Sequence, residues 1–124
     1  MATIYFKKAA DKGDKLGLFN YGAVLYRNRE KPGNLKKAVR YFKMAADLGE
    51  ICAIKNYGYL LQYGIGITQN KKEAARYLKK AADSGAIDAM INYGKMLKEG
   101  DGIPVNRKEA ERYIKMAENF KKKH

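Results

Sequence analysis

The sequence repeats itself every 36 residues, and this period constrains the fold more than any other feature. The segment Tyr-Phe-Lys-Lys-Ala-Ala-Asp that begins at Tyr5 recurs at Tyr41 and at Tyr77 with one change each, and more degenerately at Tyr113. A second marker, Asn-Tyr-Gly, begins at residues 20, 56 and 92 and keeps the same step. Two markers in phase predict a repeat array, in which each unit packs on its neighbours.

Each period carries the signals of two helices. Asn70 and Asn106 are each followed three residues later by Glu, which is the pattern of a capping box, and Asn34 holds the same place in the preceding period. Apolar residues then recur at intervals of three and four, and a glycine at 13, 49 or 85 suits the left-handed position that ends a helix. A second amphipathic segment, such as 86–99, stops at a turn rich in Gly. We therefore predict pairs of helices, named A (for example 50–63) and B (70–83), and no strand.

Residues 53–85 resemble the Sel1-like repeat, a relative of the tetratricopeptide repeat, and the resemblance covers essentially the whole chain. Small residues, the glycines Gly64 and Gly66 and the Ala-Ala pair at 81–82 all fall in phase with that family's pattern. The family often has Trp where this chain has Tyr41, Tyr77 and Tyr113, and Asp where it has Asn34, Asn70 and Asn106. Both departures keep the expected roles of core aromatic and N-cap.

The resemblance implies an all-α fold, a right-handed α/α superhelical solenoid of about seven helices, with A helices on its concave side and B helices on its convex side. It also implies a non-catalytic adaptor between proteins. We expect a single domain over 1–124, divided into a half repeat, 1–13, and repeats 14–49, 50–85 and 86–124. The unpaired first helix leaves Ile4 and its neighbours partly uncovered, so we expect that end to be a surface for self-association.

The A helices have one face that stays alike between repeats and one that changes. The constant face is predicted to be core: Leu18, Ile54 and Met90; Tyr21, Tyr57 and Tyr93; Gly22, Gly58 and Gly94; Leu25, Leu61 and Leu97. A glycine in mid-helix costs about 1 kcal/mol relative to Ala, so we expect a close approach of helices there. The changing face is formed by Leu16, Phe19, Ala23, Tyr26, Cys52, Lys55, Tyr59, Gln62, Asp88, Ile91, Lys95 and Lys98.

If the family geometry holds, the changing face lines the concave groove, aromatic at its N-terminal end and basic at its C-terminal end. We hypothesise that an acidic peptide, extended or helical, binds there. Its anchors would be Phe19, Tyr26 and Tyr59, and the residues that steer it would be Lys55, Lys95 and Lys98. The alternative is an ordinary exposed surface. Three asparagines, Asn20, Asn56 and Asn92, could bond a peptide backbone or tie neighbouring A helices together, and their constancy favours the structural role.

The B helices carry one basic stripe each, which stacking would merge into a convex basic surface. Its members lie at i, i+4 and i+7: Lys36, Arg40 and Lys43; Lys72, Arg76 and Lys79; Lys108, Arg112 and Lys115. Such a surface could meet nucleic-acid phosphate or an anionic membrane by charge alone. No aromatic residues interleave the stripe, so a solvated face is the preferred interpretation.

Composition argues against an enzyme and against bound cofactors. Ser84, Cys52 and His124 are each the only residue of their kind, so neither a catalytic triad nor a metal site with several His or Cys ligands can be assembled. We expect no catalytic residue, metal or cofactor. A lone cysteine excludes an intrachain disulfide and favours a reducing compartment such as the cytoplasm. With 26 Lys and Arg against 13 Asp and Glu, the net charge of +13 favours an acidic partner.

Overall fold

The computed structural model describes residues 7–8 and 10–123, and within these ranges every regular element is a helix. The helices are α2 (Lys15–Arg27), α3 (Asn34–Asp47), α4 (Ile51–Tyr63), α5 (Lys71–Asp83), α6 (Ile87–Glu99) and α7 (Arg107–Lys123). Residues 7, 8, 10 and 11 are helical as well, ahead of α2. The predicted uncovered surface around Ile4 lies outside the described residues.

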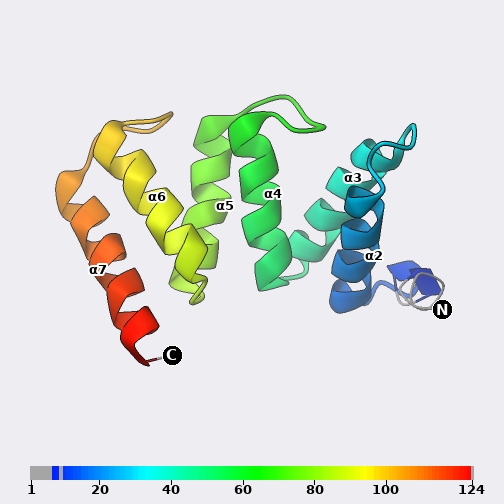
Figure 1. Ribbon diagram of the computed structural model, residues 1–124, viewed down its shortest axis with the longest axis horizontal. Helices are drawn as coiled ribbons and strands as arrows, with labels where there is room; N and C mark the ends of the chain where they lie inside the picture. Colours follow the sequence, from blue (N-terminus) through cyan, green and yellow to red (C-terminus); the bar gives the residue numbers. More distant parts are fainter. Residues whose placement is uncertain (1–6, 9, 124) are drawn as a thin grey trace.

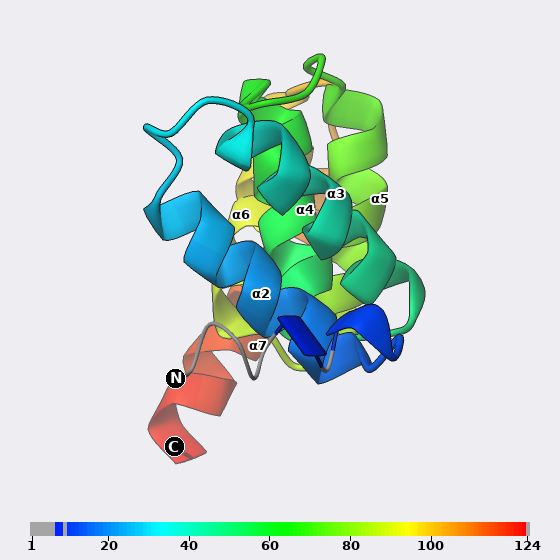
Figure 2. The ribbon, with the colours of Figure 1, turned by 90° about the vertical axis from the view of Figure 1, so that its right-hand side faces the viewer.

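The helices stack in the order of the chain, so the molecule is an all-α solenoid. Consecutive helices pack against one another, most extensively within the pairs α2 with α3, α4 with α5 and α6 with α7. In Figure 1 the array runs from α2 on the right to α7 on the left. Seen along the array in Figure 2, α2 and α6 lie toward one side, while α3 and α5 lie on the other. The predicted pairing of A helices (α2, α4, α6) with B helices (α3, α5, α7) is therefore confirmed.

The core follows the constant face of the A helices. Leu18, Ile54 and Met90 expose at most 2% of their surface. The leucines seven residues further along each A helix are also buried: Leu25, Leu61 and Leu97. The B helices contribute alanines, of which Ala81 and Ala82 are 0% and 1% exposed. Small side chains let the helices lie close together, so much of the packing is made by backbone and by methyl groups.

The mid-helix glycines mark the closest contacts between paired helices, as the sequence predicts. A Cβ atom on Gly58 would lie 3.0 Å from Cγ of Leu78, and one on Gly94 would lie 2.9 Å from Cγ1 of Ile114. On Gly22 it would lie 3.1 Å from the ring of Phe42. The cost of glycine in a helix is therefore offset by the approach it allows.

One pair of tyrosine rings joins the A and B helices of each repeat. Tyr21 and Tyr41, Tyr57 and Tyr77, and Tyr93 and Tyr113 meet edge to face, with ring centroids 4.9, 4.9 and 5.0 Å apart. Such arrangements stabilise beyond the area they bury. The predicted core role holds fully for Tyr113, which is 0% exposed, while Tyr41 and Tyr77 are half-buried.

The N-caps agree with prediction in two repeats and differ in the third. The amides of Glu73 and Glu109 donate to the Oδ1 atoms of Asn70 and Asn106, at 3.0 and 3.1 Å. The prediction for Asn34 was wrong, because α3 begins one residue earlier in its period. Its cap is Gly33, in the left-handed region, and the Asn34 side chain instead donates to the carbonyl of Asn28 at 3.0 Å.

The two glutamates of these capping boxes do not complete the box. Instead of reaching back to the cap, the carboxylate of Glu73 pairs with Arg76, and that of Glu109 pairs with Arg112. The backbone N–H groups of Asn70 and Asn106 donate instead to the carbonyls of Leu61 and Leu97, at 2.9 and 2.8 Å, so each carboxylate pairs with the arginine three residues along the helix.

The outward side of α7 differs from the same side of α5. Ala75 and Ala82 of α5 are buried under α6, whereas the residues 36 positions later on α7 are Glu111 and Glu118, both exposed. α7 also runs for 17 residues, against 13 for α5. It continues because Lys121 stands where Gly85 ends the preceding B helix.

Candidate functional site

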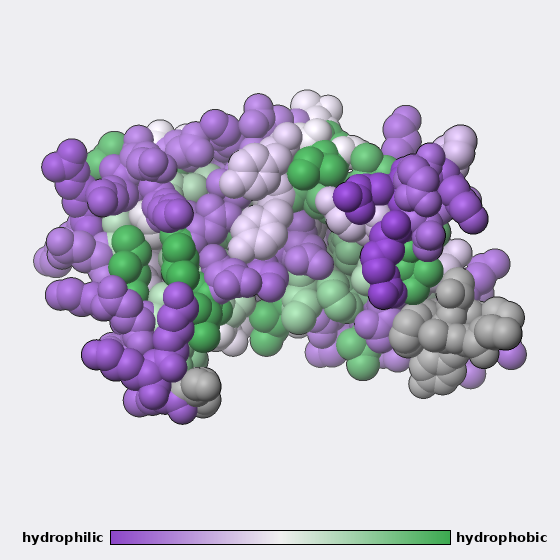
Figure 3. All heavy atoms as spheres, viewed as in Figure 1, coloured by the Kyte–Doolittle hydropathy of each residue, from purple (hydrophilic) through white to green (hydrophobic). Residues whose placement is uncertain are grey.

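The A-helix face carries most of the predicted binding residues at its surface. Figure 3 shows this side, on which hydrophobic residues are interspersed among hydrophilic ones along the whole array. Leu16, Cys52, Asp88, Lys95 and Lys98 are exposed. The half-buried members are Phe19, Asn20, Ala23, Tyr26, Lys55, Asn56, Tyr59, Ile91 and Asn92.

A small cavity opens on this face between α2 and α4. It has a volume of about 170 Å³ and is lined by Tyr26, Phe42, Asn56, Tyr59, Leu60 and Ile65. We name it the first hollow. The guanidinium of Arg29 stacks over the ring of Tyr26, 4.4 Å from its centroid. Apart from the amide of Asn56, the lining is aromatic and aliphatic.

A shallower depression follows between α4 and α6. Its lining consists of Tyr59, Tyr63, Asp88, Ile91, Asn92 and Lys95, and its volume is about 340 Å³. We name it the second hollow. Tyr59 lines both hollows, so they are adjacent along the array. Burial raises the pKa of the Tyr59 hydroxyl, which keeps this shared wall neutral.

One predicted groove residue, Gln62, is not available to a partner. It is 5% exposed, and its amide exchanges two hydrogen bonds with the amide of Asn92, at 3.1 and 2.7 Å. The assignment of Gln62 to the changing, partner-binding face is therefore corrected. It faces α6 because a polar side chain there satisfies Asn92, whose amide is partly buried. At this junction the asparagine ties neighbouring A helices together, as the structural interpretation expects.

The positive charge at the C-terminal end of the A-helix face is partly free. Lys55 pairs with Asp88 across the second hollow, with 3.6 Å between Nζ and Oδ2. Lys95 and Lys98 are exposed and have no carboxylate within ion-pair distance among the described residues. These two cations can accept an acidic group without first losing an internal partner.

On the B-helix face, several predicted cations are neutralised locally. Lys43 pairs with Asp47, Lys79 with Asp83, Arg76 with Glu73 and Arg112 with Glu109. The other five, Lys36, Arg40, Lys72, Lys108 and Lys115, have no such partner in the described part of the chain. The stripes exist, but nearly half of their charge is already compensated by carboxylates on the same helices.

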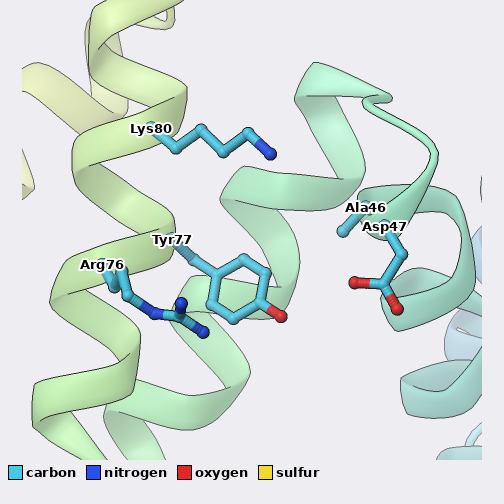
Figure 4. Close-up of a pocket in the computed structure, with 5 residues that line it drawn as sticks. All are labelled: Ala46, Asp47, Arg76, Tyr77 and Lys80. Atoms are coloured by element: carbon cyan, nitrogen blue, oxygen red, sulfur yellow. The ribbon is translucent and has the colours of Figure 1, made fainter.

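The B-helix face also has a cavity between α3 and α5, whereas a hydrogen bond joins the equivalent residues of α5 and α7. Figure 4 shows the hydroxyl of Tyr77 directed toward Asp47 across an opening of about 230 Å³, with Arg76 and Lys80 beside it. One repeat later the hydroxyl of Tyr113 donates to Asp83 at 2.7 Å. Burial and this hydrogen bond raise the pKa of Tyr113 to about 12.

The pKa of Asp83 is shifted in the opposite direction, downward. Burial alone would raise its pKa, but the hydrogen bonds from Tyr113 and Lys79 outweigh it and lower the pKa below the usual value. The carboxylate therefore stays charged as the acceptor of both groups.

The described residues offer no cluster of three or more His, Cys, Asp and Glu side chains for a metal ion. Within the same residues, no helix is both long and apolar enough to cross a bilayer. The two hollows are lined by aromatic, aliphatic and amide side chains, together with the charged groups of Asp88 and Lys95.

Comparison with protein families identifies the repeat. The family model described as "Sel1 repeat" matches residues 1–14, 16–50, 53–85 and 87–119. The chain belongs to the Sel1 repeat family. A comparison with curated proteins finds no match. Proteins built from Sel1 repeats are generally scaffolds for protein interactions, and they are typically non-catalytic.

Solved structures of Sel1 repeat proteins superpose closely on the chain. They include c5321, a protective antigen of uropathogenic Escherichia coli (TM-score 0.88, 27% identity), and a Sel1 repeat protein from Oxalobacter formigenes (0.86, 28%). The alignments cover 96% and 94% of this chain but 26% and 48% of those chains. Helicobacter pylori cysteine rich protein B shares the fold at 22% identity (TM-score 0.73), covering 96% of this chain and 85% of its own.

Proposed function

We propose that the A-helix face binds an acidic segment of another protein, so that the chain acts as a non-catalytic adaptor. The observation that carries this proposal is the pair of adjacent hollows that share Tyr59, followed by the unpaired cations Lys95 and Lys98. Half-buried aromatic rings are good anchors, since they offer large contact area at a low cost in side-chain entropy. Free lysines then provide the charge that steers an acidic partner.

The B-helix face is a weaker candidate for the same role. Its cations could meet phosphate or an anionic membrane, but Lys43, Lys79, Arg76 and Arg112 are held by carboxylates of their own helices. A phosphate that bound at these four cations would have to displace their partners, which leaves Lys36, Arg40, Lys72, Lys108 and Lys115 as the cations without a carboxylate partner among the described residues. The A-helix face requires no such exchange at Lys95 or Lys98.

Site-specific photo-crosslinking in the native cell tests the proposal. A benzophenone amino acid is placed at Ile91, inside the second hollow, and in a matched variant at Lys108, on the B-helix face. We expect adducts with another protein from position 91 that are lost when Lys95→Glu and Lys98→Glu are added, and that persist when Lys36→Glu and Arg40→Glu are added instead. Adducts that form only from position 108, or that survive reversal of Lys95 and Lys98, would contradict the proposal.

A further inference from the structure

The asparagine at equivalent positions of two consecutive repeats, Asn56 and Asn92, differs in its hydrogen bonds. Asn92 exchanges two hydrogen bonds with Gln62, which precedes it by 30 residues. Asn56 holds the equivalent place one repeat earlier, but the residue 30 positions before it is Tyr26, which cannot make that exchange. Among the described residues no side chain hydrogen-bonds to the Asn56 amide, which lies in the wall of the first hollow.

The first hollow has the size and lining of a pocket for one side chain. Small-molecule sites usually measure roughly 300 to 1,000 Å³, and the 170 Å³ of this cavity is well below that. Tyr26, Phe42, Tyr59, Leu60 and Ile65 make its wall apolar. A charged side chain would lose its hydration there without finding a counterion, so an uncharged one is favoured.

The Asn56 amide in the wall of this apolar pocket favours a ligand whose main-chain N–H and C=O groups are free to hydrogen-bond. The Asn56 side chain has both a donor and an acceptor to offer. The main chain of a helical peptide already uses its own N–H and C=O groups, whereas an extended segment leaves them open to such an amide. The hollow therefore fits an extended chain better than a helix.

Building on the proposed function, we propose that the first hollow is the specificity pocket of the A-helix face. It takes one bulky uncharged side chain, such as Leu, Met or Phe, from an extended peptide whose main chain hydrogen-bonds to Asn56. The same peptide places an acidic residue over Lys95 in the second hollow.

The geometry also sets the spacing of the two ligand residues. The hollows lie at successive junctions of α4, with α2 and with α6. Neighbouring A helices make few close contacts, so they lie no nearer than the roughly 8 to 10 Å that separates packed helices. Because an extended chain advances about 3.3 Å per residue, the bulky residue and the acidic residue are separated by at least about three positions in the ligand sequence.

Selection from a phage library of random 12-residue peptides tests this inference. On the wild-type chain we expect enrichment of peptides that carry a Leu, Met or Phe and, at least about three positions away on either side, an Asp or Glu. Tyr26→Gln gives Asn56 the partner that Gln62 gives Asn92, and it removes one wall of the hollow. That variant should lose the preference for the bulky residue while keeping the preference for acid.

Affinities measured by fluorescence anisotropy on the best peptide make the test quantitative. We expect Tyr26→Gln, or replacement of the bulky peptide residue by Ala, to weaken binding about tenfold or more, and Asn56→Ala to weaken it roughly two- to tenfold. Leu48→Ala is the control, because Leu48 is 52% exposed and lines neither hollow. It should leave both the affinity and the preference for the bulky residue unchanged. Thermal unfolding of each variant shows that it is folded, and Asn56→Ala still tests the pocket if Tyr26→Gln is not.

The outcomes separate this inference from the proposed function. Enrichment of acidic peptides without a bulky residue, or a bulky preference that survives Tyr26→Gln, overturns the specificity pocket and leaves acidic-peptide binding intact. Acidic enrichment that survives Lys95→Glu with Lys98→Glu overturns the proposed function instead. A wild-type chain that enriches no peptide overturns both.

Discussion

The two junctions between complete repeats have the same helices but different degrees of closure. At the second junction, where α4 and α5 meet α6 and α7, Gln62 bonds Asn92 on the A side, and Asp83 bonds Tyr113 on the B side. At the first junction the equivalent pairs are Tyr26 with Asn56 and Asp47 with Tyr77, and cavities take the place of both contacts.

The difference shows that the repeat fixes the backbone, while a few polar positions decide whether a junction is closed or left open. Each contact pair is separated by 30 residues, which is the distance along the chain between facing positions of neighbouring repeats. One substitution at such a position exchanges an internal hydrogen bond for a hollow that a ligand can enter. The first junction thus has room for a ligand side chain between its helices, whereas the second is tied by hydrogen bonds and offers only the shallower second hollow.

The largest effect is expected from breaking the closed A-side pair. Gln62→Ala leaves the amide of Asn92, which is partly buried, without its two hydrogen bonds, and we expect a loss of roughly 2 kcal/mol in the free energy of unfolding. Asn56→Ala at the open junction should change it by less than about 0.5 kcal/mol. Urea unfolding followed by circular dichroism measures both. Equal losses would mean that the two junctions do not differ in this way.

A smaller loss is expected on the B side. Tyr113→Phe removes the hydroxyl that donates to Asp83, and because Asp83 is partly exposed we expect a loss of about 1 kcal/mol. Tyr77→Phe is the control, since its hydroxyl faces Asp47 across the cavity, and its effect should be less than half as large. The same unfolding experiment decides, and a Tyr77→Phe variant as destabilised as Tyr113→Phe would argue against a closed second junction.

Alkaline pH should weaken the closed junction. An unfolded tyrosine loses its proton near pH 10, whereas folded Tyr113 keeps it to about pH 12. The unfolded chain then binds fewer protons than the folded one, so stability falls as pH rises from 10 to 12. Tyr57, Tyr77 and Tyr93 also have raised pKa values, so Tyr113→Phe should make this decline shallower without abolishing it. Urea unfolding at pH 9, 10 and 11 measures how steeply the free energy of unfolding declines with pH. A Tyr113→Phe variant whose decline is as steep as that of the wild type would contradict this prediction.

The smallest effect is expected at a pair of positions that is charged at the second junction and apolar at the first. Ahead of α7, Asp101 pairs with Lys71, 2.6 Å between Oδ1 and Nζ, and the equivalent residues one repeat earlier are Ile65 and Leu35. The double change Lys71→Leu with Asp101→Ile copies the apolar version. Because the ion pair is partly exposed, we expect stability to change by no more than about 1 kcal/mol. Added salt should weaken the wild type more than the variant, and an equal response would contradict this.

The period and the apolar spacing were enough to predict the helices, their order and their core, because these depend on features repeated in every unit. The contacts that distinguish one junction from another were not predicted. Gln62 was assigned to the binding face by its place on α4, since helical spacing does not show what faces it from the next repeat. Comparing each residue with the one 30 positions later would have matched Gln62 with Asn92.

Asn34 shows a different limit. Its equivalents, Asn70 and Asn106, are N-caps, but the loop before it has Pro32 and Gly33 in place of the two glycines found later. That loop starts α3 one residue early, so a side chain of the right type is displaced from the cap. Sequence equivalence predicted the residue but not the path of the backbone leading to it.

The glutamates at 111 and 118 have a consequence for assembly. The end of a solenoid exposes a face that packs on a further repeat, and the opposite end of another copy could dock on it, head to tail, to form fibres of indefinite length. A further unit docking on α7 as α6 docks on α5 would have to bury both carboxylates at positions where α5 has methyl groups, a cost that opposes such growth. Glu111 and Glu118 therefore disfavour the docking of a second copy of this chain on the exposed side of α7.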